Sequence, residues 1–171
     1  MRTPLRTARR KSVAVTILLV AAESAAGAAF PDATRRALDQ VDLVLSAGLV
    51  GTLAGLSITS AALSLVFYNF LSERMRVAGG ERRADDVKSL EIQRKSLVDA
   101  GKNMVNAFYS FVLAMILILF LENGFATQFP PDVLNSIVIT SSTTAPFISG
   151  LVFLVEGARS LRDAFGQFEI G

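Results

Sequence analysis

Three long runs without a charged residue constrain the fold more than any other feature of this sequence. They cover residues 43–71, 104–121 and 133–155. An α-helix rises about 1.5 Å per residue, so roughly 20 apolar residues cross a hydrocarbon core about 30 Å thick. Each run is near that length or longer, and 51% of the chain is hydrophobic. The sequence therefore predicts an all-α integral membrane protein, with a single membrane domain over residues 1–171.

The stretch SVAVTILLVAAESAAGAAF, residues 12–30, is also long enough to cross a membrane, but it contains Glu23. An acidic residue at a helix centre costs about 2.5–3.5 kcal/mol on insertion, and each Leu, Ile, Val or Phe returns about 0.3–0.6 kcal/mol. The seven such residues in this stretch offset the acid without clearly exceeding it. As an isolated helix the segment is therefore marginal, and it needs a neighbouring helix that supplies a partner for Glu23.

Two main interpretations of this segment follow from its residues. In the first, it is retained as a span over residues 13–30, with Glu23 facing other helices. In the second, the basic start and the apolar stretch form a signal peptide that is cleaved after Ala28, because small residues surround that position. A helix lying on the membrane surface is a third alternative. We expect the retained span, which gives a bundle of four transmembrane helices, whereas cleavage leaves three.

The distribution of the 17 Lys and Arg residues predicts the topology, because cytoplasmic loops carry the excess of positive charge. Residues 1–12 and 72–103 hold five and eight of these residues. Residues 31–42 hold two, and residues 122–132 hold none. Both termini and residues 72–103 are therefore predicted to lie in the cytoplasm, which makes the chain a multi-pass protein of the cell (inner) membrane.

The second predicted span, residues 43–71, contains small residues that recur at every fourth position. Small residues let two helix backbones approach closely, which favours association where lipid removes the hydrophobic effect. Such a surface serves either packing within this chain or contact with another subunit. Its members are Ala47, Gly51, Gly55 and Thr59.

The fourth predicted span, residues 133–155, carries five consecutive hydroxyl residues shortly before Pro146. Successive residues turn by about 100°, so these hydroxyls surround the helix and do not form a single stripe. Ser136, Thr140 and Thr143 nevertheless share one side. Together with Glu23 they are the candidate lining of a polar path. The structural alternative is a local kink, because proline removes one backbone hydrogen bond and hydroxyls can bond back to carbonyls.

Residues 72–103 are predicted to form a cytoplasmic helical stalk. From residue 81 onward no proline interrupts the path into the third span, so a continuous helix extends about 35 Å beyond the membrane. The eight positive and six negative charges of this loop are typical of a solvated helix and not of a nucleic-acid surface. Apolar residues recur along it at a spacing of three to four, which Arg94 and Gly101 interrupt. They are Val87, Leu90, Leu97, Met104, Phe108 and Phe111.

The apolar stripe of this predicted stalk needs a cover. The C-terminal residues 156–171 offer one, because Leu161, Phe165 and Phe168 share a face of a short amphipathic helix. That helix is predicted to dock on the stalk or to lie on the inner leaflet. If it does neither, the stalks of neighbouring chains have to cover each other.

Composition excludes several kinds of chemistry. The chain contains no Cys and no His, so it offers neither thiolate nor imidazole to a metal ion or to acid–base catalysis. It has no phosphate-binding loop and no recognisable nucleophile constellation. We therefore expect no metal, no cofactor and no enzymatic activity. The expected partners are the lipid bilayer and either a second copy or other membrane subunits, and not nucleic acid.

The leading hypothesis from the sequence is a non-catalytic assembly or accessory subunit of a homo- or hetero-oligomeric membrane complex. The small-residue surface, the uncovered stripe of the stalk and the lack of reactive groups motivate it. The alternative is a small oligomeric channel or transporter, in which the Ser/Thr-rich fourth span lines the path.

Overall fold

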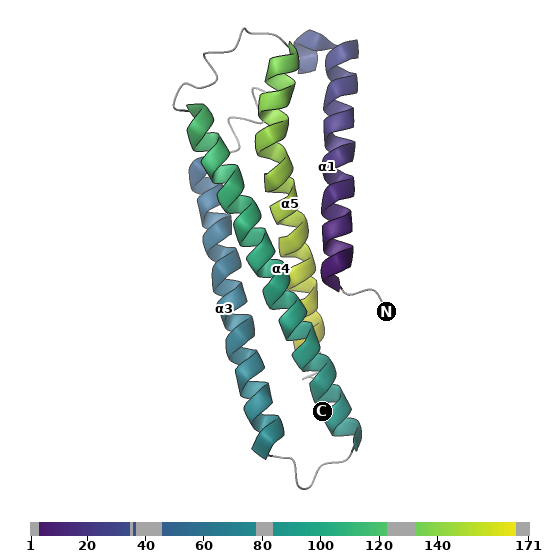
Figure 1. The fold of residues 1–171 in the computed structure, drawn as a ribbon, viewed down its shortest axis with the longest axis vertical. Helices are drawn as coiled ribbons and strands as arrows, with labels where there is room; N and C mark the ends of the chain where they lie inside the picture. Colours follow the sequence, from purple (N-terminus) through teal and green to yellow (C-terminus); the bar gives the residue numbers. More distant parts are fainter. Residues whose placement is uncertain (1–3, 35, 37–45, 78–83, 123–132, 167–171) are drawn as a thin grey trace.

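Long helices account for almost all of the residues that the structure describes. The computed structural model describes residues 4–34, 36, 46–77, 84–122 and 133–166. Over these ranges the chain is helical and forms no strand, which confirms the predicted all-α class. The long helices are α1 (Pro4–Ala29), α3 (Ala47–Val77), α4 (Ala84–Glu122) and α5 (Val133–Gly166). They lie side by side with their axes roughly aligned (Figure 1).

Three of these helices are long and apolar enough to cross a membrane. The qualifying segments are Arg10–Ala29, Ala47–Arg76 and Val87–Phe120. The first contains Glu23 and nevertheless meets the requirement. The described side chains of α5 begin at Ser141, where a cluster of hydroxyl residues lowers its hydropathy. A fourth span in α5 therefore stays a prediction.

All four helices extend beyond the predicted spans, and α4 and α5 do so by the most residues. α4 runs for 39 residues without a break, a length of about 58 Å, and joins the predicted stalk to the third span in one helix. α5 continues through Pro146 as far as Gly166. The residues predicted as a separate amphipathic tail are therefore, up to Gly166, the last turns of α5. The remainder of the tail, including Phe168, lies outside the described residues.

The helices form a layer with the order α3, α4, α5, α1. α4 packs extensively against α3 on one side and against α5 on the other, and α1 packs mainly against α5 (Figure 1). The contacts of α1 with α4 and of α3 with α5 are minor. α1 and α3 therefore stand at opposite ends of the layer. Each has a face that its neighbour within the described part of the chain leaves open.

The buried face of α4 follows an uninterrupted seven-residue repeat. Large side chains occupy every seventh position, and smaller or polar residues lie between them, so the spacing alternates strictly between three and four. All are buried, and Phe111 and Ala107 have no exposed surface. The large residues are Leu90, Leu97, Met104, Phe111 and Ile118, and those between them are Gln93, Ala100, Ala107 and Ala114.

This repeat corrects the predicted stripe in part. Leu90 and Leu97 are buried as part of the repeat, but the side chain of Val87 is 44% exposed and that of Phe108 is only half-buried. Arg94 and Gly101 do not interrupt the repeat, because the positions between the large residues are one residue earlier. The physical reason is the helical period. Gln93 and Ala100, and not Arg94 and Gly101, lie on the same face of α4 as Leu90, Leu97 and Met104.

Two glycines of α5 receive large side chains of α4. A Cβ atom added to Gly150 would lie 2.6 Å from a ring carbon of Phe111, and one added to Gly157 would lie 3.0 Å from Met104. Both pairs are separated by seven residues along their helices, so one repeat fits into the other. Close packing of this kind is the main source of helix association in a membrane.

The described end of α5 covers the part of α4 around Leu90 and Leu97. Ala164 is buried in a cluster with Leu71, Leu90 and Leu97, and Leu161 packs against that cluster. The ring of Phe165 meets the ring of Phe67 of α3 edge-on, with 4.9 Å between centroids. This docking agrees with one of the two positions predicted for the tail. The stripe of α4 therefore needs no stalk of a neighbouring chain.

We predict that Gly150→Ala lowers the free energy of unfolding by about 1–3 kcal/mol, because the added methyl group overlaps the Phe111 ring in a packed core. Unfolding in mild detergent, followed by circular dichroism, measures the effect. Gly166→Ala in the same helix is the matched control, because no described atom lies within 4 Å of its added Cβ. Equal stability of Gly150→Ala and the wild type would contradict the packing described.

Candidate functional site

Polar contacts join α1 to α5 along much of their length. The Lys11 ammonium donates a hydrogen bond to Glu156 at 2.6 Å, and the hydroxyls of Ser12 and Ser149 are hydrogen-bonded to each other. Further along, the Ser141 hydroxyl donates to a carboxylate oxygen of Glu23. The residue numbers rise on α1 as they fall on α5, so the two helices run antiparallel. We call these contacts the α1–α5 seam.

The Ser141 hydroxyl is a hydrogen-bond partner for Glu23. α1 needs such a partner, because its acid makes it only marginally stable as an isolated helix in a membrane. Ser141 is buried and Glu23 is half-buried, so the contact is sheltered within the interface. A hydroxyl that donates to a carboxylate oxygen stabilises the acid where water is scarce. The sequence indicated the need for a partner but not its identity, because Ser141 is one of five adjacent hydroxyl residues.

The predicted polar path is only partly described. Thr143 is buried in α5, two residues from the partner of Glu23. The side chains of Ser136 and Thr140 lie outside the described residues, although the backbone of both belongs to α5. What the structure brings together is therefore Glu23 with Ser141, and not a continuous line of the four predicted residues.

Glu156 anchors the other end of the seam. Besides the bond from Lys11, one of its carboxylate oxygens accepts a hydrogen bond from Arg159 at 3.1 Å. Both cations are about half exposed, so the ion pairs contribute little to stability. Their effect is to fix where the start of α1 meets α5.

We predict an energetic coupling between Glu23 and Ser141. Ser141→Ala should lower the free energy of unfolding by about 1 kcal/mol in the wild type, which is typical of a hydrogen bond between membrane helices. In a Glu23→Leu background the same change should have almost no effect, because the acceptor is gone. Unfolding of the four chains in detergent gives the coupling.

The control is Ser24→Ala, since the Ser24 hydroxyl bonds to the Val20 carbonyl of its own helix at 2.7 Å. This change should be insensitive to the residue at position 23. An equal effect of Ser141→Ala in both backgrounds would mean that the hydrogen bond does not contribute.

α3 packs on α4 through a face that differs from the predicted one. Ala47 and Gly51 lie on the side of α4, and the added Cβ of Gly51 would meet the Met115 sulfur at 3.6 Å. Gly55 and Thr59 are exposed instead. The residues that α3 buries follow a spacing of three and four, with few large side chains. They are Val50, Ala54, Ser57, Ala61, Ser64 and Leu71.

The opposite side of α3 carries a strip of small residues, Gly48, Thr52, Gly55 and Thr59, which we call the outer strip. All four are exposed, and no described atom lies within 4 Å of a Cβ added to either glycine. Each threonine hydroxyl donates to a glycine carbonyl of its own helix at 2.9 Å. Their donors are satisfied internally, so the strip presents mainly small apolar surface.

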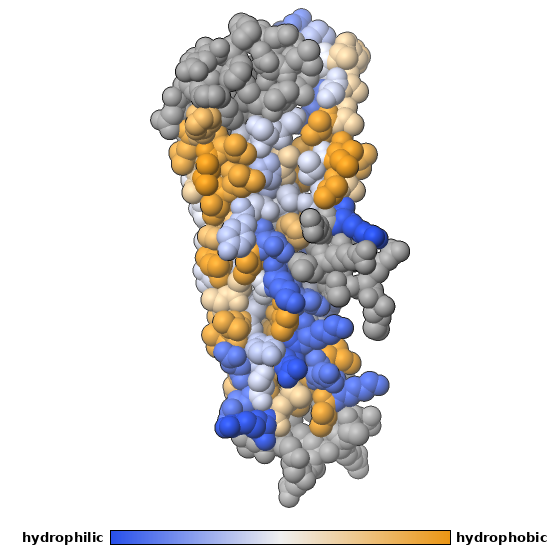
Figure 2. Space-filling view, viewed as in Figure 1, coloured by the Kyte–Doolittle hydropathy of each residue, from blue (hydrophilic) through white to orange (hydrophobic). Residues whose placement is uncertain are grey.

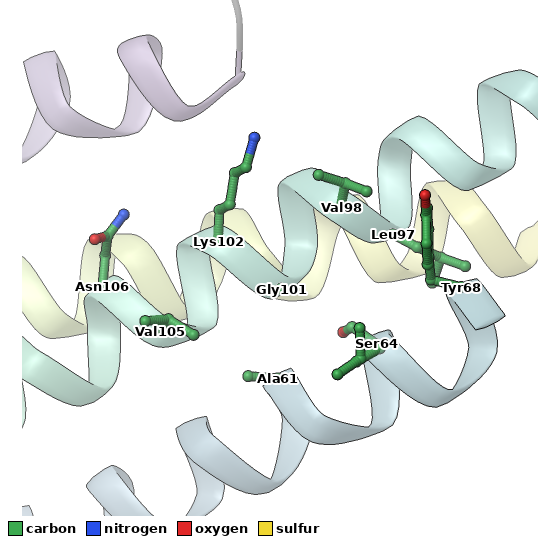
Figure 3. A pocket seen from close by; sticks show the side chains of 10 residues that line it. Ala61, Ser64, Tyr68, Leu97, Val98, Gly101, Lys102, Val105 and Asn106 are labelled. Atoms are coloured by element: carbon green, nitrogen blue, oxygen red, sulfur yellow. The ribbon is translucent and has the colours of Figure 1, made fainter.

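A groove of about 590 Å³ opens between α3 and α4. Figure 3 shows Ala61, Ser64 and Tyr68 of α3 facing the groove-lining residues of α4. Its size falls within the range of about 300–1,000 Å³ that is common for ligand sites. The sequence contains no sign of this groove, because it depends on how α3 and α4 are aligned.

Some buried polar atoms have no partner among the described residues. Both amide atoms of Asn103 are in this state, although its side chain has no exposed surface. The side-chain oxygens of Gln93 and Ser72 are also unpaired. Such atoms cost stability unless water or another group satisfies them. Among the described residues no group of three or more acidic side chains is positioned to hold a metal ion.

Comparison of the chain with protein-family models, curated protein sequences and solved structures found no match.

Proposed function

We propose that this protein is a non-catalytic subunit of an oligomeric membrane complex, and that it assembles through the outer strip of α3. The exposure of Gly48 and Gly55, with open space around both, is the observation that carries the proposal. In lipid, a helix face made of small residues gains stability only when another helix packs closely on it. α3 lies at one end of the layer, so α4 leaves this face open.

The arrangement of the helices favours assembly through α3 over assembly through the predicted stalk. The stripe of α4 is covered by α3 and α5 of its own chain, so it does not need the stalk of a neighbouring chain as a cover. The outer strip keeps a spacing of four, three and four, so its members stay on one side of the helix. A second copy of the chain is the first partner to test.

Cysteine crosslinking in membranes provides the test, because the chain has no cysteine of its own. We expect Thr59→Cys to form disulfide-linked dimers on mild oxidation. Ser57→Cys should stay monomeric, because Ser57 is fully buried against α4. Ile58→Cys, which is exposed and turned by about 100° from Thr59 around α3, controls for random collisions and should crosslink several times less.

Native mass spectrometry of protein extracted from its own membrane completes the test. A dimer, a ring of copies or a complex with another subunit would support assembly. A bare monomer, together with equal crosslinking at positions 58 and 59, would contradict it. The mass of the dissociated chain also tests the first helix, since the full chain is 18.3 kDa and removal of residues 1–28 would make it measurably lighter.

A small channel or transporter is the second candidate, and the contact of Glu23 with the Ser141 hydroxyl of α5 favours it. An intramembrane acid between helices is a common feature of ion pathways. In this case proteoliposomes should show ion or solute flux that Glu23→Gln or Thr140→Val reduces. Absence of flux, or flux that neither substitution changes, would leave the Glu23–Ser141 contact with a structural role only.

A further inference from the structure

The groove between α3 and α4 has an apolar interior. Leu65 and Ala61 of α3 lie opposite Val98 and Val105 of α4 across it. The Ser64 hydroxyl also lines the groove, but it donates to the Ser60 carbonyl at 2.8 Å and so offers no free donor. An occupant therefore meets mainly hydrocarbon surface over the length of the groove.

The groove lies where the apolar part of α4 ends but that of α3 continues. A Cβ added to Gly101 would lie 3.7 Å from Ser64, so these two positions are at the same level. In its first half, α4 carries charges between its first turn and Lys102. α3 has no charge before Glu73. Leu65, Val66 and Phe70 of α3 are exposed in this part. Figure 2 shows hydrophilic side chains along the lower half of α4 with apolar side chains beside them.

The polar residues that α4 contributes to the groove lie at its rim. Figure 3 shows Lys102 and Asn106 on the outer side of α4, with both side chains pointing away from α3. The stem of Lys102 lines the groove, and its exposed ammonium forms no ion pair with any described residue. At the other end the Arg94 guanidinium lies 5.7 Å from the centroid of the Tyr68 ring. Two cations therefore flank an apolar groove.

We propose that this groove binds one anionic phospholipid. One acyl chain lies between α3 and α4, and the phosphate accepts hydrogen bonds from Lys102 and Asn106 at the rim. Lysines at a membrane surface keep their stems in apolar surroundings and their ammonium groups among headgroups. An unpaired cation beside an apolar groove selects a lipid that carries net negative charge over a zwitterionic one. The proposal rests on membrane insertion and is independent of assembly through α3.

Native mass spectrometry in mild detergent tests lipid binding directly. The probes are phosphatidylglycerol and phosphatidylcholine with the same acyl chains, each added at the same concentration. We expect the wild-type monomer to retain one phosphatidylglycerol, about fivefold more than phosphatidylcholine, which is the usual effect of one cation near an anionic headgroup. Lys102→Gln should abolish this preference. Lys95→Gln, the same change at an exposed residue of α4 outside the groove, should keep it.

A second pair of variants tests the groove itself. Val105→Trp fills it and should reduce retention of both lipids, whereas Leu113→Trp places the same side chain on exposed surface of α4 and should not. Equal retention of the two lipids by the wild type would overturn the proposal. An equal loss of preference in Lys95→Gln, or no effect of Val105→Trp, would do so as well. Because retention is read on the monomer, a failure of assembly leaves this result intact.

Discussion

The fit between α4 and α5 is the interaction on which the rest of the structure depends. Large residues of α4 repeat every seven positions, and Gly150 and Gly157 of α5 repeat with the same period. Phe111 and Met104 therefore enter recesses that only glycine leaves open. In lipid, apolar side chains gain nothing by leaving water, so the closeness of packing decides which helices associate and in which register. A shift by one residue would place a large side chain against a Cβ atom.

The other two helices are positioned through this pair. The face of α3 that packs on α4 consists mainly of small residues such as Ala54 and Ala61, so the backbone of α3 also approaches α4 closely. α1 has a weaker apolar character and lies against α5, where Glu23 and Lys11 form polar contacts. The layer order follows from these three interfaces. It leaves the outer side of α3 open, and the proposed assembly uses that side.

A single helix also connects two environments. α4 is about 58 Å long, which exceeds the thickness of a hydrocarbon core. From Leu90 to Ile118 its buried face is mostly apolar and also holds Gln93, Asp99 and Asn103. Its outer face changes from apolar residues such as Leu113 to charged ones such as Lys102 and Lys95. α3 changes from apolar to charged at a different level. The groove proposed to bind lipid lies at this offset between the two helices.

Much of the architecture could be predicted from the sequence, because run length and charge alone determine where apolar helices form. The structure divides the predicted small-residue face between two sides of α3 for a geometric reason. Residues spaced by four drift by about 40° per step around a helix, so Ala47 and Thr59 cannot face the same neighbour. The full repeat of α4 was difficult to recognise in the sequence, because Gln93 and Ala100 are not strongly apolar, although their spacing completes it. The identity of Ser141 as the partner of Glu23, and the groove, depend on register between helices, which no single segment reveals.

The register of α4 against α5 is the central claim, and a pair of double-cysteine variants tests it most directly. Met104→Cys with Gly157→Cys should form an intramolecular disulfide in membranes. The Cγ of Met104, the position that a cysteine sulfur would take, lies 3.1 Å from the added Cβ of Gly157, and a disulfide needs the two residues this close. Met104→Cys with Gly150→Cys is displaced by two helical turns and should not. A disulfide in the second variant and none in the first would show that the two helices do not pack in this register.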